Sequence, residues 1–132
     1  MRILVVDDHE PFRRFVASTL QDRQNLNVIG EAGDGLEAVQ RAQALQPDLI
    51  LLDIGLPGLN GLDAARQISK VAPSARIIFL TQESASDVVG EALDLGAWGY
   101  VAKVQAGREL LDAVDKVMRG QRFVSSSLHG HK

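Results

Sequence analysis

The sequence predicts an α/β fold, a doubly wound parallel sheet of five strands in (βα)5 order. Five short apolar runs rich in β-branched residues recur along the chain, at residues 3–6, 28–32, 49–52, 77–80 and 100–102. Continuous apolar runs of this kind are typical of parallel strands that are buried on both faces. Because crossovers between parallel strands are right-handed, the intervening segments are expected to cover both faces of the sheet.

Segments with a helical period lie between and after these runs. Each carries one apolar stripe, as expected of a helix that packs against a sheet. The stripes are Phe12, Phe15, Val16, Thr19 and Leu20; Leu36, Val39, Ala42 and Leu45; Leu62, Ala65 and Ile68; Val88, Val89, Ala92 and Leu93; and Leu110, Leu111, Val114, Val117 and Met118. Pro11 suits a first helical turn, and capping-box spacing is found in Asp34 with Glu37 and in Ser84 with Asp87.

Composition and charge indicate one soluble domain that does not itself bind nucleic acid. The 132 residues are 45% hydrophobic and 23% charged, which suits a single full core. The net charge of −3 and the pI of about 5.5 contrast with the basic surface of nucleic-acid-binding proteins. The chain has no cysteine, which excludes disulfides and thiolate chemistry. The first apolar run meets Asp7 too early for a signal peptide, and no run approaches membrane-spanning length, so we predict a cytoplasmic protein without membrane contact.

Residues 1–120 are predicted to form the domain, and residues 121–132 a C-terminal tail or the start of a linker. From residue 120 onward the sequence reads GQRFVSSSLHGHK, which loses the helical period and gathers Ser, Gly and His. We therefore expect poor order in the tail, including its two histidines, His129 and His131.

Polar side chains stand where four of the predicted strands end. The first strand is followed by Asp7 and Asp8, the third by Asp53, the fourth by Thr81 and the fifth by Lys103. In open parallel sheets, ligands bind beyond the carboxyl ends of the strands. Three converging carboxylates repel one another unless a divalent cation shares them, and an oxygen-only ligand set favours Mg²⁺. The hydroxyl and the ammonium beside them are groups that would hold a phosphoryl oxygen.

These residues resemble the receiver domain of two-component response regulators. The matching positions are Asp7, Asp8, Asp53, Pro57, Gly61, Thr81, Tyr100 and Lys103. The segments HEPFRRFVASTL, GEAGDGLEAV and ALDLGAWGYVAK are most similar to the LuxR-type (NarL/FixJ-like) branch. The resemblance covers about residues 1–120 and implies a flavodoxin-like sheet with strand order 2-1-3-4-5.

The resemblance also implies a chemistry. Asp53 would be the phosphoacceptor, taking a phosphoryl group from a sensor histidine kinase or from a small phosphodonor. Asp8, Asp53 and the backbone carbonyl of Gly55 would bind Mg²⁺, with Asp7 acting through a metal-bound water. Thr81 and Lys103 would hold the phosphoryl group, so that the domain catalyses only its own phosphorylation and slow dephosphorylation and is not otherwise an enzyme.

In this family the hydroxyl of Thr81 and the ring of Tyr100 would form the switch. Their movement would reshape the surface of the fourth helix, fifth strand and fifth helix. The expected output is transcription, through a DNA-binding domain absent from this chain, with homodimerisation on phosphorylation as a possibility that the sequence leaves open.

Three positions would modulate this chemistry. Gln82 stands where the family commonly has a small residue, so its amide would narrow access to Asp53 or suit a different phosphodonor. Gly55 and Glu83 occupy positions that tune dephosphorylation in the family. Since Gly55 offers no side-chain shielding and Glu83 would orient water, we expect a short phosphoryl lifetime.

Other charged residues are expected to be bystanders. Arg13 and Arg14 in the first helix and Lys70 in the third are predicted to lie on solvated faces, and His9 is predicted to take no part in metal binding.

Other functions share parts of this sequence pattern. A stand-alone regulator acting by protein contact and a phosphorylation-independent pseudo-receiver both stay open; Gln82 is the support for the latter. A phosphatase of the haloacid dehalogenase type would place its second aspartate two residues after the first, whereas Asp8 is followed by His9 and Glu10. A flavin-binding protein would need a phosphate-binding loop where this chain has acidic residues.

Overall fold

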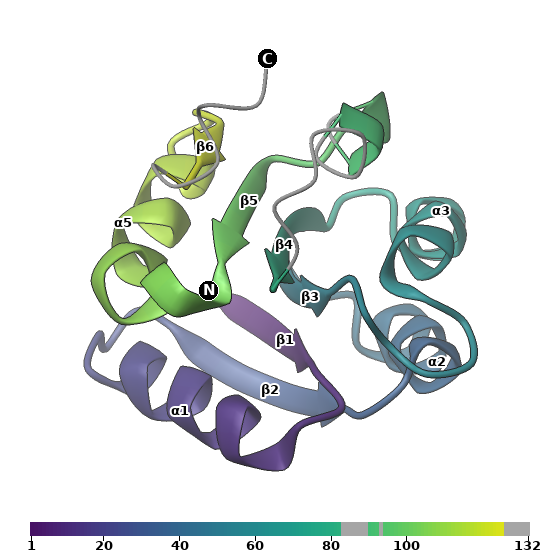
Figure 1. Cartoon of the computed structure of the whole chain (residues 1–132), viewed down its shortest axis with the longest axis horizontal. Helices are drawn as coiled ribbons and strands as arrows, with labels where there is room; N and C mark the ends of the chain where they lie inside the picture. Colours follow the sequence, from purple (N-terminus) through teal and green to yellow (C-terminus); the bar gives the residue numbers. More distant parts are fainter. Residues whose placement is uncertain (83–89, 93, 126–132) are drawn as a thin grey trace.

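One parallel sheet organises the computed structural model, which describes residues 1–82, 90–92 and 94–125 (Figure 1). Its strand order is β2-β1-β3-β4-β5-β6, and every neighbouring pair is parallel. The strands are β1 (Arg2–Val6), β2 (Asn27–Ala32), β3 (Leu49–Asp53), β4 (Arg76–Thr81), β5 (Gly99–Ala102) and β6 (Phe123–Val124). The predicted fold class is confirmed, and the five predicted strands match β1 to β5 within one residue at each end.

Helices cover both faces of this sheet, as the crossover rule requires. They are α1 (Glu10–Gln21), α2 (Gly35–Leu45), α3 (Gly61–Val71) and α5 (Ala106–Met118), with a 3-10 turn, η1 (Lys103–Gln105), before α5. In Figure 1, α1 and α5 lie on one side of the sheet, and α2 and α3 lie on the other. Residues 90–92 and 94 are helical, while Ser84, Asp87 and most of the predicted fourth stripe lie outside the described residues.

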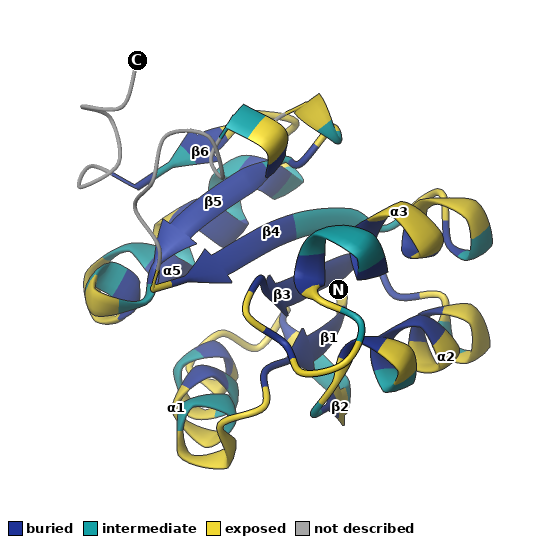
Figure 2. Ribbon diagram, turned by 45° about the vertical axis from the view of Figure 1, so that its right-hand side comes forward, coloured by how far each residue is buried: buried dark blue, intermediate teal, exposed yellow. Residues whose placement is uncertain are grey.

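Two apolar clusters, one on each side of the sheet, form the core. Leu49 and Leu51 of β3 belong to the cluster under α1 and α5, whereas Ile50 and Leu52 belong to the cluster under α2 and α3. This alternation follows from the two-residue period of a strand. Figure 2 shows β3 and β5 as buried and β4 as buried in all but its first two residues, whereas β2 is only partly buried because it lies at the edge of the sheet.

The local start signals act as predicted in two helices. Pro11 lies in the first turn of α1. The carboxylate of Asp34 accepts a hydrogen bond from the Glu37 N–H (2.8 Å), and the Glu37 carboxylate accepts one from the Gly33 N–H (2.9 Å). The reciprocal pair of bonds satisfies donors at the start of α2 that the helix itself cannot use.

A sixth strand corrects the prediction of five. Phe123 and Val124 pair with Gly99 and Tyr100 of β5, and Phe123 packs into the core cluster beneath α5. The sequence pattern missed this strand because two residues are too few to show a period. Residues 126–132 of the predicted tail, including its histidines, lie outside the described residues, and the domain boundary at residue 120 stays a prediction.

No helix within residues 1–82, 90–92 and 94–125 is both long enough and apolar enough to span a membrane.

Candidate functional site

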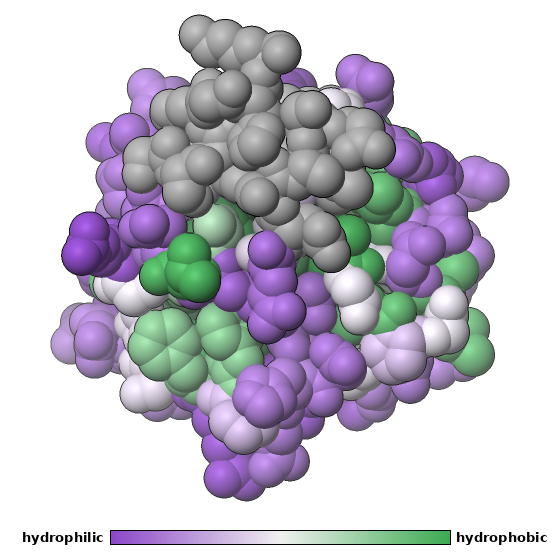
Figure 3. Space-filling view, viewed as in Figure 1, coloured by the Kyte–Doolittle hydropathy of each residue, from purple (hydrophilic) through white to green (hydrophobic). Residues whose placement is uncertain are grey.

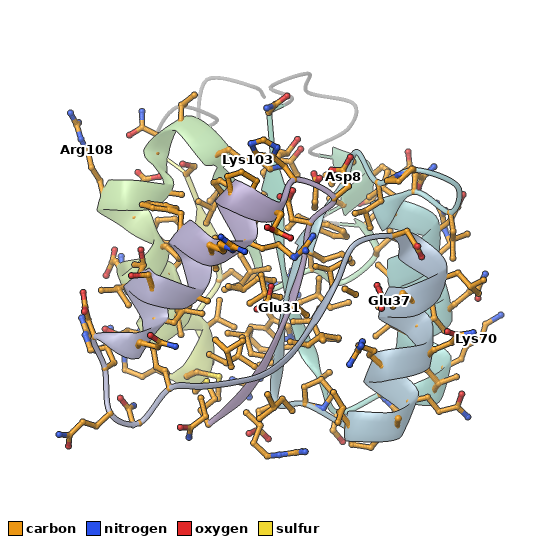
Figure 4. All side chains as sticks on the ribbon, turned by 90° about the horizontal axis from the view of Figure 1, so that it is seen from below. Asp8, Glu31, Glu37, Lys70, Lys103 and Arg108 are labelled. Carbon is orange, nitrogen blue, oxygen red and sulfur yellow. The ribbon has the colours of Figure 1, made fainter. Side chains whose placement is uncertain are left out.

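The carboxyl ends of β1, β3, β4 and β5 meet at one edge of the sheet and carry the predicted polar residues there. A pocket at this edge has a volume of about 540 Å³ and is lined by Asp8, His9, Phe12, Asp53, Gly55, Thr81, Gln82, Lys103 and Val104. Figure 4 shows Asp8 and Lys103 at this same end of the sheet. The structure therefore brings together residues that lie far apart in the chain, such as Asp8 and Lys103.

Three carboxylates form the acidic part of the site. Asp7, Asp8 and Asp53 each offer an oxygen, and these oxygens lie within 4.8 Å of one another. Asp7 is fully buried and Asp53 nearly so, whereas Asp8 is exposed to the pocket. Buried like charges are costly unless a cation shares them, and carboxylate oxygens are ligands that Mg²⁺ accepts. The donor set therefore fits the predicted magnesium ion.

Lys103 supplies positive charge from the opposite wall. Its Nζ lies 2.6 Å from Oδ2 of Asp7 and 3.3 Å from Oδ2 of Asp53, so one ammonium contacts both buried carboxylates. The ring of Phe12 lies beneath the same ammonium, 4.8 Å from Nζ to the ring centroid. A cation over an aromatic face is attracted by the negative electrostatic potential that the ring quadrupole produces there. Phe12, predicted only as a core residue, is thus also part of the pocket wall.

Burial raises the pKa of Asp53 above its ordinary value of 3.8. The hydrogen bond from the Gly55 N–H to Oδ1 (3.0 Å) and the charge of Lys103 act in the opposite direction, while the Asp7 carboxylate adds to the increase. Ionised Asp53 is therefore poorly solvated at neutral pH, and a bound divalent cation would favour its charged form.

This raised pKa predicts that Asp53→Asn stabilises the metal-free protein at neutral pH. The pKa of Asp53 is higher in the folded state than in the unfolded state, so protonation of Asp53 stabilises the fold, and this contribution is fully present below about pH 3.8. The contribution is lost as the pH rises through the folded-state pKa. The amide in Asp53→Asn does not titrate, so the variant does not lose stability in this way. Urea unfolding in EDTA, measured from below pH 3.8 to pH 7, should show that the free energy of unfolding depends less on pH in the variant than in the wild type. Asp112→Asn, at an exposed carboxylate, is the control. Equal stability of Asp53→Asn and the wild type at pH 7 would contradict the raised pKa of Asp53.

The turn after β3 holds Asp53 in place through glycines. The N–H of Gly61 donates to the carbonyl of Ile54 (2.8 Å), which folds the start of α3 back onto the end of β3. A Cβ on Gly61 would lie 2.2 Å from the Asp53 carbonyl oxygen, so this close approach requires glycine. Gly55 contributes its N–H to Asp53, and the metal-binding role of its carbonyl stays a prediction.

The predicted switch residues lie on adjacent strands. Thr81 ends β4 and is buried, with Ala102 of β5 as its neighbour in register. Tyr100 is fully buried, and its ring centroid is 6.4 Å from that of Phe79. The ring thus lies in the core cluster under α2 and α3, and the backbone carbonyl of Tyr100 accepts a hydrogen bond from the Ser125 N–H (2.8 Å) just beyond β6.

Two modulating residues differ in how far the structure describes them. Gln82 is exposed and lines the pocket, as its predicted effect on access requires. Glu83 lies outside the described residues. Val104, with 86% of its surface exposed, also lines this pocket.

The expectation that Arg13 is solvated was wrong. Only 18% of its side chain is exposed, and its Nη1 donates to the backbone carbonyl of Asp7 (2.6 Å). Arg14 is 77% exposed and pairs with Glu10, as a solvated residue would. Two adjacent arginines look alike in sequence because helix phase alone does not reveal which long side chain can reach a backbone carbonyl.

The fold and this site together define a class of protein. A parallel sheet of this strand order, with an acidic cluster at the ends of β1 and β3, a threonine at the end of β4 and a lysine after β5, has the features of a receiver domain.

Comparison with known proteins bears this out. The family model "Response regulator receiver domain" matches residues 3–115, so the chain belongs to the receiver-domain family of two-component response regulators. Receiver domains are signalling domains, and the haloacid dehalogenase and flavin-binding alternatives are thereby excluded.

Individual relatives place the chain in the LuxR-type branch. Response regulator UvrY of Escherichia coli O6:H1 is 34% identical over 97% of this chain, and transcriptional regulatory protein LiaR of Bacillus subtilis is 35% identical over 98%. The crystal structure of a LuxR-family two-component response regulator from Aurantimonas sp. SI85-9A1 has a TM-score of 0.93 at 32% identity, covering 98% of this chain and 93% of that one. The chain spans 59% of the length of UvrY and 62% of that of LiaR.

Proposed function

We propose that this domain receives a phosphoryl group on Asp53 in an Mg²⁺-dependent reaction and so acts as a phosphorylation switch. The observation that carries the proposal is the placement of Asp53 in an open pocket, within 4.8 Å of two further carboxylates and 3.3 Å from the Lys103 ammonium. Two carboxylates and an ammonium that the proposed chemistry uses therefore lie near Asp53.

The residues divide the work between them. The Gly55 N–H engages Oδ1 of Asp53, which leaves Oδ2, facing Lys103, as the oxygen that attacks phosphorus. A P–O bond to Asp53 forms as the bond from phosphorus to the donor breaks, and the donor keeps the electron pair of that bond. Bound Mg²⁺, held by Asp8, Asp53 and the Gly55 carbonyl with Asp7 acting through water, would supply charge neutralisation between carboxylate and phosphoryl oxygens. Lys103 and Thr81 would then hold the transferred group.

A sensor histidine kinase is the proposed donor. Figure 3 shows an apolar patch over α1 and η1, the elements that bring Phe12 and Val104 to the pocket. Phe15 is 43% exposed and Val104 86% exposed on these elements. An apolar surface beside the reacting carboxylate suits a protein donor, whose phosphohistidine must reach Asp53 from outside.

The proposed output is control of transcription, in keeping with the name of LiaR. Phosphorylation would draw Thr81 toward the site and move Tyr100, changing the surface around β5 and α5. We further propose a cytoplasmic location, and dimerisation on phosphorylation as an accompanying step. A domain acting alone by protein contact would use the same switch.

Intact-mass measurement tests the proposal. With acetyl phosphate and Mg²⁺, the wild type should gain one phosphoryl group, and the gain should disappear with EDTA or in Asp53→Asn. Asp48→Asn, which alters an aspartate that bonds the Arg2 N–H at the opposite end of β1, is the matched control and should be phosphorylated normally. A gain that survives in Asp53→Asn would overturn the assignment. No gain in the wild type, together with no response of Trp98 fluorescence or oligomeric state to beryllofluoride and Mg²⁺, would favour a pseudo-receiver.

A further inference from the structure

We infer that Arg13 is a positioning residue that holds the Asp7–Asp8 loop in its metal-binding conformation and thereby raises the Mg²⁺ affinity of the site; the inference rests on the proposed function. Arg13 itself touches none of the pocket carboxylates in the contacts described. It acts on the backbone carbonyl of Asp7, which lies between the side chains of Asp7 and Asp8 along the chain.

The guanidinium of Arg13 joins three parts of the fold. Its Nη1 donates to the Asp7 carbonyl (2.6 Å), its Nε donates to Oε1 of Glu31 in β2 (3.0 Å), and its Nη2 lies 4.0 Å from Oε2 of Glu10. Figure 4 shows Glu31 lower on the sheet than the edge at which Asp8 and Lys103 lie. The planar, multidentate guanidinium can make these contacts in different directions at once, which a lysine ammonium cannot do in the same geometry.

The Asp7 carbonyl is a sensitive point in the loop. It belongs to the same planar peptide unit as the Asp8 N–H, so fixing its direction also fixes how the chain enters Asp8. The other groups of Asp7 are already held: its N–H donates to the Ala32 carbonyl (3.0 Å), Oδ1 accepts from the His9 N–H (2.8 Å) and Oδ2 contacts Lys103. The bond from Arg13 is therefore the contact that orients the peptide leading to the exposed carboxylate of Asp8.

If only the charge of Arg13 mattered, its removal would raise the Mg²⁺ affinity, which is the opposite of the effect expected from positioning. Removing a positive charge near three carboxylates should strengthen the binding of a divalent cation, because less positive charge competes with it. If Arg13 acts by positioning, its removal should weaken binding, since Asp8 would spend only part of its time in the binding conformation. The sign of the change in affinity thus separates the two effects.

Isothermal titration calorimetry with Mg²⁺ tests the inference. We expect Arg13→Gln to bind Mg²⁺ about tenfold more weakly, the lower end of the effect for groups that orient metal ligands. Glu31→Gln should weaken binding less, and Arg13→Lys should recover part of the affinity because one donor can still reach the Asp7 carbonyl. Arg14→Gln, which removes the same charge from the next residue of α1, should bind at least as tightly as the wild type.

Phosphorylation at saturating Mg²⁺ and Mg²⁺ binding by the wild type show whether a negative result concerns Arg13, the metal site or the phosphoacceptor. At saturating Mg²⁺, Arg13→Gln should be phosphorylated by acetyl phosphate to the wild-type extent, because it keeps every group that contacts the phosphoryl. Unchanged or tighter Mg²⁺ binding by Arg13→Gln, with or without a lower Tm, would overturn the role of Arg13 and leave the proposed function intact. A wild type that binds no Mg²⁺ would overturn the metal site itself and with it this inference. Mg²⁺ binding with neither phosphorylation nor a response to beryllofluoride would overturn only the phosphoacceptor role.

Discussion

Lys103→Met is expected to destabilise the metal-free protein by about 3 kcal/mol and to make its stability strongly dependent on Mg²⁺. The side chain of Lys103 is 12% exposed, and it contacts two carboxylates that are 0% and 7% exposed, Asp7 and Asp53. Methionine preserves much of the volume but leaves these buried negative charges facing each other. A divalent cation binds the folded state and not the unfolded one, so Mg²⁺ should return much of the lost stability.

Urea unfolding with EDTA, and again with Mg²⁺, measures this effect. Lys116→Met is the matched control, because Lys116 pairs with Asp112 on the exposed side of α5 and the loss of such a pair costs little. Adding Asp53→Asn to Lys103→Met should restore part of the stability by removing one of the two facing charges. A Lys103→Met protein as stable as the wild type in EDTA would show that Lys103 is not needed to balance Asp7 and Asp53.

Gly61→Ala is expected to cost about 4 kcal/mol or more and to disturb the site at the same time. A Cβ at this position would lie 2.2 Å from the Asp53 carbonyl oxygen and 2.6 Å from Cα of Ile54. Both are backbone atoms at the end of β3, so no side-chain rotation relieves the overlap. The start of α3 must move away, which breaks the hydrogen bond from Gly61 to Ile54 and releases the turn that supports Asp53.

Gly90→Ala provides the control for this substitution. Gly90 is helical and its added Cβ would meet no atom of the described residues within 4 Å, so alanine should stabilise the protein by about 0.5–1 kcal/mol. Thermal unfolding of both variants should give shifts of opposite sign. A small loss of stability for Gly61→Ala would mean that the turn after β3 is more adaptable than its geometry indicates.

The strands and the location of the site follow from the hydrophobic pattern of the sequence. The runs at residues 3–6 and 49–52 marked buried parallel strands, because only strands covered on both faces can be apolar at every position. Once the strands were placed, the rule that parallel strands end at one edge was enough to gather Asp53, Thr81 and Lys103 into one site. The acidic pair after β1 completed a donor set whose chemistry could be named from residue types alone.

Other features depended on distances in space. The bridging of Asp7 and Asp53 by Lys103, the raised pKa of Asp53 and the clamp of Arg13 on the Asp7 carbonyl all require particular atoms from separate elements to meet. A residue type states what a side chain can bind but not which partner lies within reach.

The strand β6 is also a feature that the sequence pattern did not predict and that packing decided. Phe123 and Val124 carry no pattern of their own, and they become a strand because β5 offers an open edge and α5 returns the chain beside it. Periodicity is a property of neighbouring residues, so sequence alone placed the regular elements and the residues at their ends. The edge strand and the contacts that tune the carboxylates were decided by packing, since they depend on surfaces that exist only after the chain has folded.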